Sequence, residues 1–144
     1  GISYMPQEKS LAYAVQGQGA FLNHQPIKLN QEKNIQDAYI TTASVKYFEQ
    51  GGYTAGLAKL SLDAQYLRSY AELWGWHLFF QGKFDAQIEG GGQVWDFAAH
   101  ALITQEAGGV VTDFTGQPYT PASTSILASN SFLHPKILQY FRKQ

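Results

Sequence analysis

The stretch EGGGQVWDFAAHALITQEAGG, residues 89–109, decides the fold class because it joins a strand to a helix and then ends the helix. Residues 84–88 before it alternate in the manner of a strand. The three glycines that follow Glu89 form a conformationally permissive loop. Asp96 then stands where a helix N-cap is expected. The stretch therefore predicts a strand, a glycine loop and a helix in direct succession.

The helix that follows carries Phe97, Ala101 and Leu102 on one side, and Gly108-Gly109 ends it. Residues 110–114 return as a strand. The same reading outward predicts further strands at 1–4, 11–15, 20–22, 38–42, 65–69 and 125–128, and helices at 45–50, 54–64, 71–80 and 133–141.

Three of these helices carry more specific predictions. Residues 54–64 place Leu57, Leu60 and Leu62 near one face. In the next helix the pattern favours core packing for Trp74, Trp76 and His77, with Gly82 as a left-handed stop. Asn130 or Ser131 could cap the last helix.

Strands that alternate with helices after residue 30 predict an α/β fold, a layered α-β-α sandwich with helices on the faces of a mixed sheet. Residues 1–30 do not follow this rhythm and predict a β-hairpin. An isolated two-stranded ribbon is marginal in water, so we expect upstream residues or a second copy of the chain to cover its edge.

Composition excludes several classes of protein. With 144 residues and 44% hydrophobic content, the chain can bury one core. Ten basic and eleven acidic residues give a net charge of −1, which argues against a nucleic-acid partner. Cysteine is absent, so a metal would need oxygen or imidazole ligands. No apolar run is long enough for a membrane span and no signal segment opens the chain, which leads us to expect a soluble, cytoplasmic protein.

Asp96 is the first candidate for chemistry. A carboxylate at a helix N-terminus behind a glycine loop can cap the helix, and it can also hold a hard cation that meets phosphate oxygens. Spacing alone does not decide between these two roles. Glu89, at the start of the same loop, is either a solvated acid or a ligand-binding one. Glu106 is assigned to the helix end or a surface contact.

A long pattern resembles the C-terminal signature of the inositol monophosphatase family. It consists of Trp95-Asp96-Phe97-Ala98-Ala99, Gln105-Glu106-Ala107-Gly108-Gly109 and Thr112-Asp113-Phe114-Thr115-Gly116. Shorter matches occur from residue 13 to residue 130. The resemblance implies that residues 1–30 end the family's N-terminal α+β domain, and that residues 31–144 form its C-terminal α/β domain.

The resemblance also implies site roles. Asp96 matches an aspartate that ligates Mg²⁺, and Glu89 stands seven residues earlier, where the family has a glutamate that binds a substrate hydroxyl. Ala71 replaces a glycine whose backbone amide meets substrate. Glu72 lies where histidinol-phosphate phosphatases have an acid, which could attract a cationic amine. Several branches of the family are inhibited by lithium, and a homodimer is expected.

The family's upstream glutamate ligand and its Asp-Pro-Ile-Asp-Gly-Thr motif have no counterpart in these 144 residues. In the family these residues supply most of the metal ligands. They also help to activate the water molecule that attacks phosphorus in line. We therefore expect the chain to be the C-terminal portion of a phosphomonoesterase for a small phosphate monoester, inactive by itself. The alternative is a non-catalytic ligand-binding or dimerisation module with the same fold.

Overall fold

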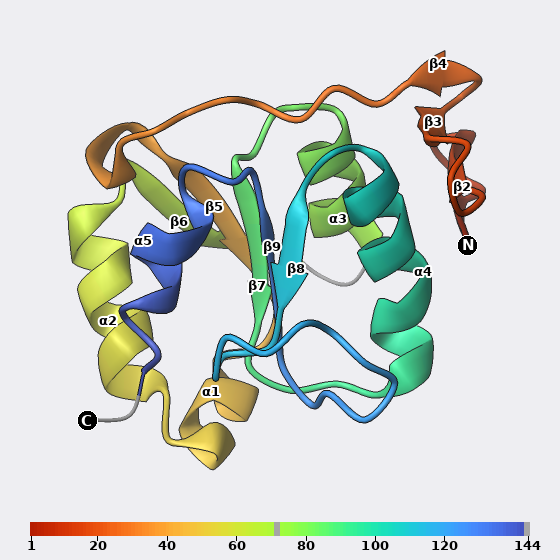
Figure 1. Cartoon of the computed structure of the whole chain (residues 1–144). Helices are drawn as coiled ribbons and strands as arrows, with labels where there is room; N and C mark the ends of the chain where they lie inside the picture. The colour runs from red at the N-terminus through yellow and green to blue at the C-terminus, as the bar shows by residue number, and fades with distance from the viewer. Residues whose placement is uncertain (71–72, 143–144) are drawn as a thin grey trace.

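The computed structural model describes residues 1–70 and 73–142, and the strands in these ranges form two sheets (Figure 1). The N-terminal residues form a small antiparallel sheet with the order β1-β2-β3-β4, rather than a single hairpin. Its strands are β1 (Ile2–Met5), β2 (Ser10–Ala14), β3 (Ala20–Leu22) and β4 (Gln25–Pro26).

The main sheet is mixed, as predicted, with the order β6-β5-β7-β9-β8. β5 runs parallel to both β6 and β7, whereas β9 runs antiparallel to β7 and to β8. The strands are β5 (Tyr39–Thr42), β6 (Tyr66–Ser69), β7 (Ala86–Glu89), β8 (Val110–Thr112) and β9 (Ile126–Ser129).

Helices cover both faces of the main sheet, which confirms the predicted α/β sandwich (Figure 1). One face carries α3 and α4, and the other carries α2 and α5. The helices are η1 (Ile35–Asp37), α1 (Val45–Gly51), α2 (Thr54–Asp63), α3 (Leu73–Phe80), α4 (Val94–Glu106) and α5 (His134–Leu138). None of the helices in the described ranges combines the length and the apolar character needed to cross a bilayer.

The alternation of β9 shows how one strand serves two cores. Ile126 and Ala128 pack with the cluster under α3 and α4, whereas Leu127 packs with the cluster under α2 and α5. Side chains along a strand point alternately to its two faces. All three are fully buried because helices cover both faces. β9 thus reads as a nearly continuous apolar run, with helices on each side of it.

The small sheet packs on the same side as α3 and α4. Ala12, Ala14 and Ala20 are buried in one cluster with Trp76 and Phe97 from those helices. α4 contacts β1, β2 and β3, and α3 contacts β1 and β2. The N-terminal residues therefore support the two helices that carry the candidate site.

Two predicted elements differ in detail. Leu62 is 86% exposed, because it lies two positions after Leu60 and so points away from the face that Leu57 and Leu60 bury. β8 ends at Thr112 because the Asp113 carboxylate accepts hydrogen bonds from the backbone amides of Thr115 and Gln117, which turns the chain.

The last helix is also shorter than predicted, since α5 ends at Leu138. The predicted cap at Asn130 or Ser131 was wrong, because the N-cap of α5 is Leu133 and no side chain caps it. The Asn130 side chain accepts hydrogen bonds from the backbone amides of Phe132 and Leu133 at 2.9 Å, in the turn that leads into α5.

Candidate functional site

The candidate site lies where the parallel strands β5 and β7 end and α4 begins. Thr42, the last residue of β5, pairs with Ile88 on β7, so both strands deliver their carboxyl ends to one edge of the sheet. Open α/β sheets bind ligands at such edges. A hollow of about 360 Å³ is found there, lined by Ala43, Ser44, Tyr47, Leu73, Trp76, Glu89, Gly91, Gly92, Trp95, Asp96 and His100.

Asp96 lines this hollow from the first turn of α4, but it is not the N-cap. The helix begins at Val94 and its N-cap is Gln93, three residues earlier than predicted. Asp96 instead accepts a hydrogen bond from the Gln93 backbone amide through Oδ2 at 2.8 Å, the return half of a capping box. The prediction of the cap position was wrong because an acid at the third helical position can also satisfy a free amide at the start of a helix, by accepting from the backbone N–H of the N-cap residue.

Glu89 ends β7 and is only 9% exposed. Its Oε1 accepts hydrogen bonds from Trp76 Nε1 at 2.8 Å and from Gln87 Nε2 at 2.9 Å. A buried carboxylate requires such donors, because an unpaired buried charge is costly. Glu89 is therefore a buried, hydrogen-bonded acid in the wall of the hollow, and it is not a solvated residue of a loop.

Two glycines bring the loop after Glu89 close to its neighbours. A Cβ on Gly90 would lie 2.8 Å from the backbone nitrogen of Phe48 in α1. A Cβ on Gly92 would overlap the ring of Phe97 in α4. These positions need glycine because any side chain would displace the loop from α1 and α4.

The sequence pattern assigned no role to His100, which the structure places beside both candidate acids. Its Nδ1 lies 2.8 Å from the Asp96 carbonyl oxygen, and its ring stacks on Trp76 with centroids 4.6 Å apart and planes 7° apart. Burial lowers the pKa of His100 to about 4, so the ring is neutral at pH 7. The four-residue spacing from Asp96, which places both on one helix face, was the available signal.

The other predicted residues have mixed outcomes. Trp76 and His77 are buried as predicted, whereas Trp74 is 41% exposed, since it lies two residues before Trp76 and so on the opposite side of the helix. Glu106 makes the predicted surface contact, because its carboxylate accepts hydrogen bonds from the backbone amides of Gly17 and Gly19 at 2.8 and 2.9 Å. The predicted substrate contacts Ala71 and Glu72 lie outside the described residues.

The donor set suits a hard cation but is incomplete. Asp96 and Glu89 offer carboxylate oxygens in one hollow, which Mg²⁺ prefers. In the described ranges no group of three or more His, Cys, Asp or Glu residues is arranged to hold a metal. Asp96 by itself would supply one of the several oxygen ligands that such a hard cation takes.

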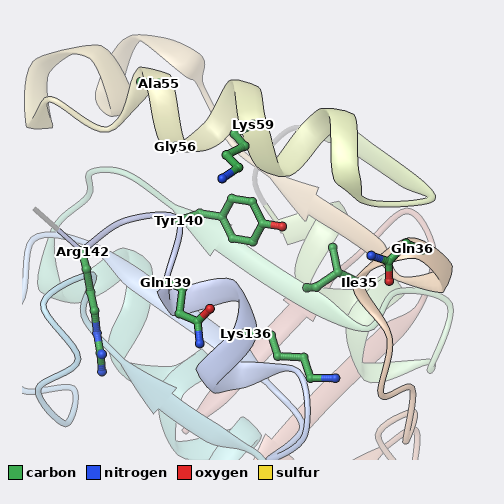
Figure 2. A pocket seen from close by; sticks show the side chains of 9 residues that line it. All are labelled: Ile35, Gln36, Ala55, Gly56, Lys59, Lys136, Gln139, Tyr140 and Arg142. Atoms are coloured by element: carbon green, nitrogen blue, oxygen red, sulfur yellow. The ribbon is translucent and has the colours of Figure 1, made fainter. Parts of the chain in front are cut away.

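A larger hollow of about 560 Å³ lies between α2 and α5, away from these acids (Figure 2). Lys59, Lys136 and Arg142 line it, but Figure 2 shows their charged ends well apart from one another. The ammonium group of Lys136 donates to the Lys33 carbonyl oxygen at 2.6 Å. The size of this hollow therefore does not make it the better candidate, because it gathers no convergent set of groups.

Comparison with known proteins gives a consistent result. The profile of the inositol monophosphatase family matches residues 1–144. A histidinol-phosphatase of Streptomyces coelicolor is 30% identical over 137 residues, which cover 92% of this chain and 51% of the relative. A probable inositol 1-monophosphatase of Mycobacterium tuberculosis is 33% identical over 146 residues, 96% of this chain and 54% of the relative.

Among solved structures, the extragenic suppressor protein suhB of Bartonella henselae has a TM-score of 0.89 at 27% identity. The likeness covers 99% of this chain and 57% of that one. The chain thus spans about half the length of the relatives that it matches.

Proposed function

The chain belongs to the inositol monophosphatase family, and we propose that it forms the C-terminal half of a Mg²⁺-dependent phosphatase that hydrolyses a small phosphate monoester. The observation that carries the proposal is the shared hollow of Asp96 and Glu89, at the carboxyl ends of β5 and β7 and beside the N-terminus of α4. That place suits a phosphate, because free backbone amides and the helix dipole favour negative charge there.

In this proposal Asp96 is a Mg²⁺ ligand and Glu89 binds the substrate. The Asp96 carboxylate keeps one oxygen on the Gln93 amide, which sets its direction, and the other is available to a cation. A bound Mg²⁺ would neutralise phosphate charge and stabilise the charge that develops during phosphoryl transfer. Glu89, oriented by Trp76 and Gln87, accepts a hydrogen bond from a hydroxyl group of the leaving alcohol.

The Mg²⁺ site requires acids that this chain does not supply. Two-metal phosphoryl chemistry needs several oxygen ligands for each ion, and one carboxylate cannot replace them. We therefore propose that residues 1–30 complete an N-terminal domain whose other residues provide the remaining ligands, and that residues 31–144 by themselves form the C-terminal domain. The 144-residue chain alone would be inactive.

The substrate class is a small phosphorylated alcohol, such as an inositol phosphate or histidinol phosphate. These two are suggested by the names of the relatives from M. tuberculosis and S. coelicolor. We also propose a cytoplasmic homodimer inhibited by lithium, with neither nucleic acid nor membrane as a partner. The balance of ten basic and eleven acidic residues supports the last point.

A panel of phosphate monoesters tests the proposal in the full-length protein, with and without Mg²⁺, beside the 144-residue chain. We expect turnover of at least one sugar, inositol or histidinol phosphate that requires Mg²⁺ and is absent for the short chain. Equal turnover by the short chain would contradict the claim that it is incomplete. An inert full-length protein that still binds the phosphorylated compounds would favour the non-catalytic module.

A further inference from the structure

A chain of buried hydrogen bonds links the small sheet to the start of α4. Ser10 Oγ lies 2.7 Å from His77 Nδ1, and His77 Nε2 lies 3.0 Å from Ser3 Oγ. Ser3 Oγ lies 2.9 Å from His100 Nε2, and His100 Nδ1 lies 2.8 Å from the Asp96 carbonyl oxygen. The four side chains are each at most 5% exposed. Two come from β1 and β2, one from α3 and one from α4.

The chemistry of these groups sets the direction of every bond in the chain. A carbonyl oxygen only accepts, so His100 Nδ1 carries the proton and the Nε2 of the neutral ring is an acceptor. Ser3 must then give its single hydroxyl proton to His100 and accept from His77 Nε2. His77 Nδ1 is consequently an acceptor, and Ser10 donates to it. One carbonyl group at α4 thus determines both histidine tautomers.

The imidazole of His100 also contacts Trp76, the residue that donates a hydrogen bond to Glu89. The ring of His100 lies flat on Trp76, whose Nε1 donates to Glu89. His100 therefore touches the backbone of Asp96 on one side and the residue that holds Glu89 on the other. A side chain in this place can fix the separation of the two acids.

We propose that Ser10, His77, Ser3 and His100 form a positioning network, which sets the place of Asp96 from the small sheet. It acts through the first turn of α4 and touches no reacting atom. The role of Asp96 as a Mg²⁺ ligand rests on the proposed function, but the bond directions do not. Groups that orient metal ligands commonly change metal affinity about 10–100-fold when they are removed.

The first test reads the two tautomers by ¹⁵N NMR of histidine-labelled full-length protein at pH 7.5 without Mg²⁺. Variants His77→Gln and His100→Gln assign the signals. We expect His100 to be protonated at Nδ1 and His77 at Nε2. A His100 ring protonated at Nε2 would overturn the proposal, whatever the protein's activity.

The second test removes the central hydroxyl group with Ser3→Ala. We expect amide hydrogen exchange at residues 96–100 to become about tenfold faster in the Mg²⁺-free protein, with the end of α4 unchanged. Calorimetric titration should show that Mg²⁺ binds about tenfold more weakly. This is the low end of the range given above for groups that orient metal ligands, because His100 contacts the backbone of Asp96 and not its carboxylate.

Thr104→Val is the matched control. Its hydroxyl group donates to the His100 carbonyl oxygen at 2.8 Å, so this hydrogen bond stays within α4 instead of joining α4 to the small sheet. We expect this variant to bind Mg²⁺ as the wild type does, even if its stability falls. Wild-type exchange and Mg²⁺ affinity in Ser3→Ala would show that the network is structural only and would overturn the proposal. A wild-type protein that binds no Mg²⁺ would instead refute the proposed function. In that case the amide hydrogen exchange of Ser3→Ala and the two histidine tautomers would still test the positioning network.

Discussion

Lowering the pH should destabilise the protein through His134, and the structure sets the size of the effect. His134 is 5% exposed, with Nε2 3.0 Å from Thr112 Oγ1. Burial lowers its pKa from the ordinary value of 6.5 to about 4. Below pH 6.5 the unfolded chain binds a proton that the folded chain refuses, so the stabilising contribution is complete above pH 6.5 and is lost as pH falls toward 4. The pKa difference corresponds to about 3 kcal/mol in full, of which about 2 kcal/mol is lost by pH 5.

Urea unfolding of the wild type and His134→Gln at pH 7.5, 6 and 5 measures this contribution. The substitution removes the titrating group but leaves every carboxylate in place, so the general effect of acid cancels in the difference. We expect the difference in free energy of unfolding to shrink by about 2 kcal/mol between pH 7.5 and pH 5. Parallel curves for the wild type and His134→Gln would refute the reasoning.

Three further predictions concern the core, the loop and the small sheet. Phe114→Ala should lower the free energy of unfolding by about 3–5 kcal/mol in a urea titration, because this 1% exposed ring stacks on Phe141 at 4.2 Å; a loss below about 1 kcal/mol would contradict the packing. Gly90→Ala should cost about 1–3 kcal/mol and reduce turnover, since its Cβ would meet the backbone of Phe48; unchanged turnover and stability would show that the loop yields freely. Glu106→Gln should lower the melting temperature more at pH 7 than at pH 3.5. Two backbone amides hold the pKa of this carboxyl below its usual range, so its stabilising contribution is lost on acidification. An equal or larger effect at pH 3.5 would contradict this.

Much of the fold could be predicted because its local signals agree with its packing. The apolar run of β9 and the glycine stop at Gly108, with φ of +81°, mark element type and ends directly. The four-stranded pairing of the small sheet was not predicted, because β3 and β4 cover only three and two residues and carry little periodicity.

The candidate site was predicted less completely than the fold. Asp96 and Glu89 could be chosen from their motif, and the structure brings both into one hollow. The contacts of His100 with Trp76 and Ser3 could not be predicted, because they join α4 to α3 and β1 across distances that no sequence spacing encodes. The cap was misplaced by three residues because Gln93 and Asp96 share the capping.

The most direct test of the central claim is a Mg²⁺ titration of phosphatase activity in the full-length protein with Asp96→Asn. The amide keeps the size of the side chain but removes the charge that a hard cation requires. We predict a loss of turnover of about 100-fold or more and a shift to higher Mg²⁺ concentration, whereas Asp37→Asn, at an exposed acid of η1, should behave as the wild type. A wild-type Mg²⁺ dependence in Asp96→Asn would contradict the account.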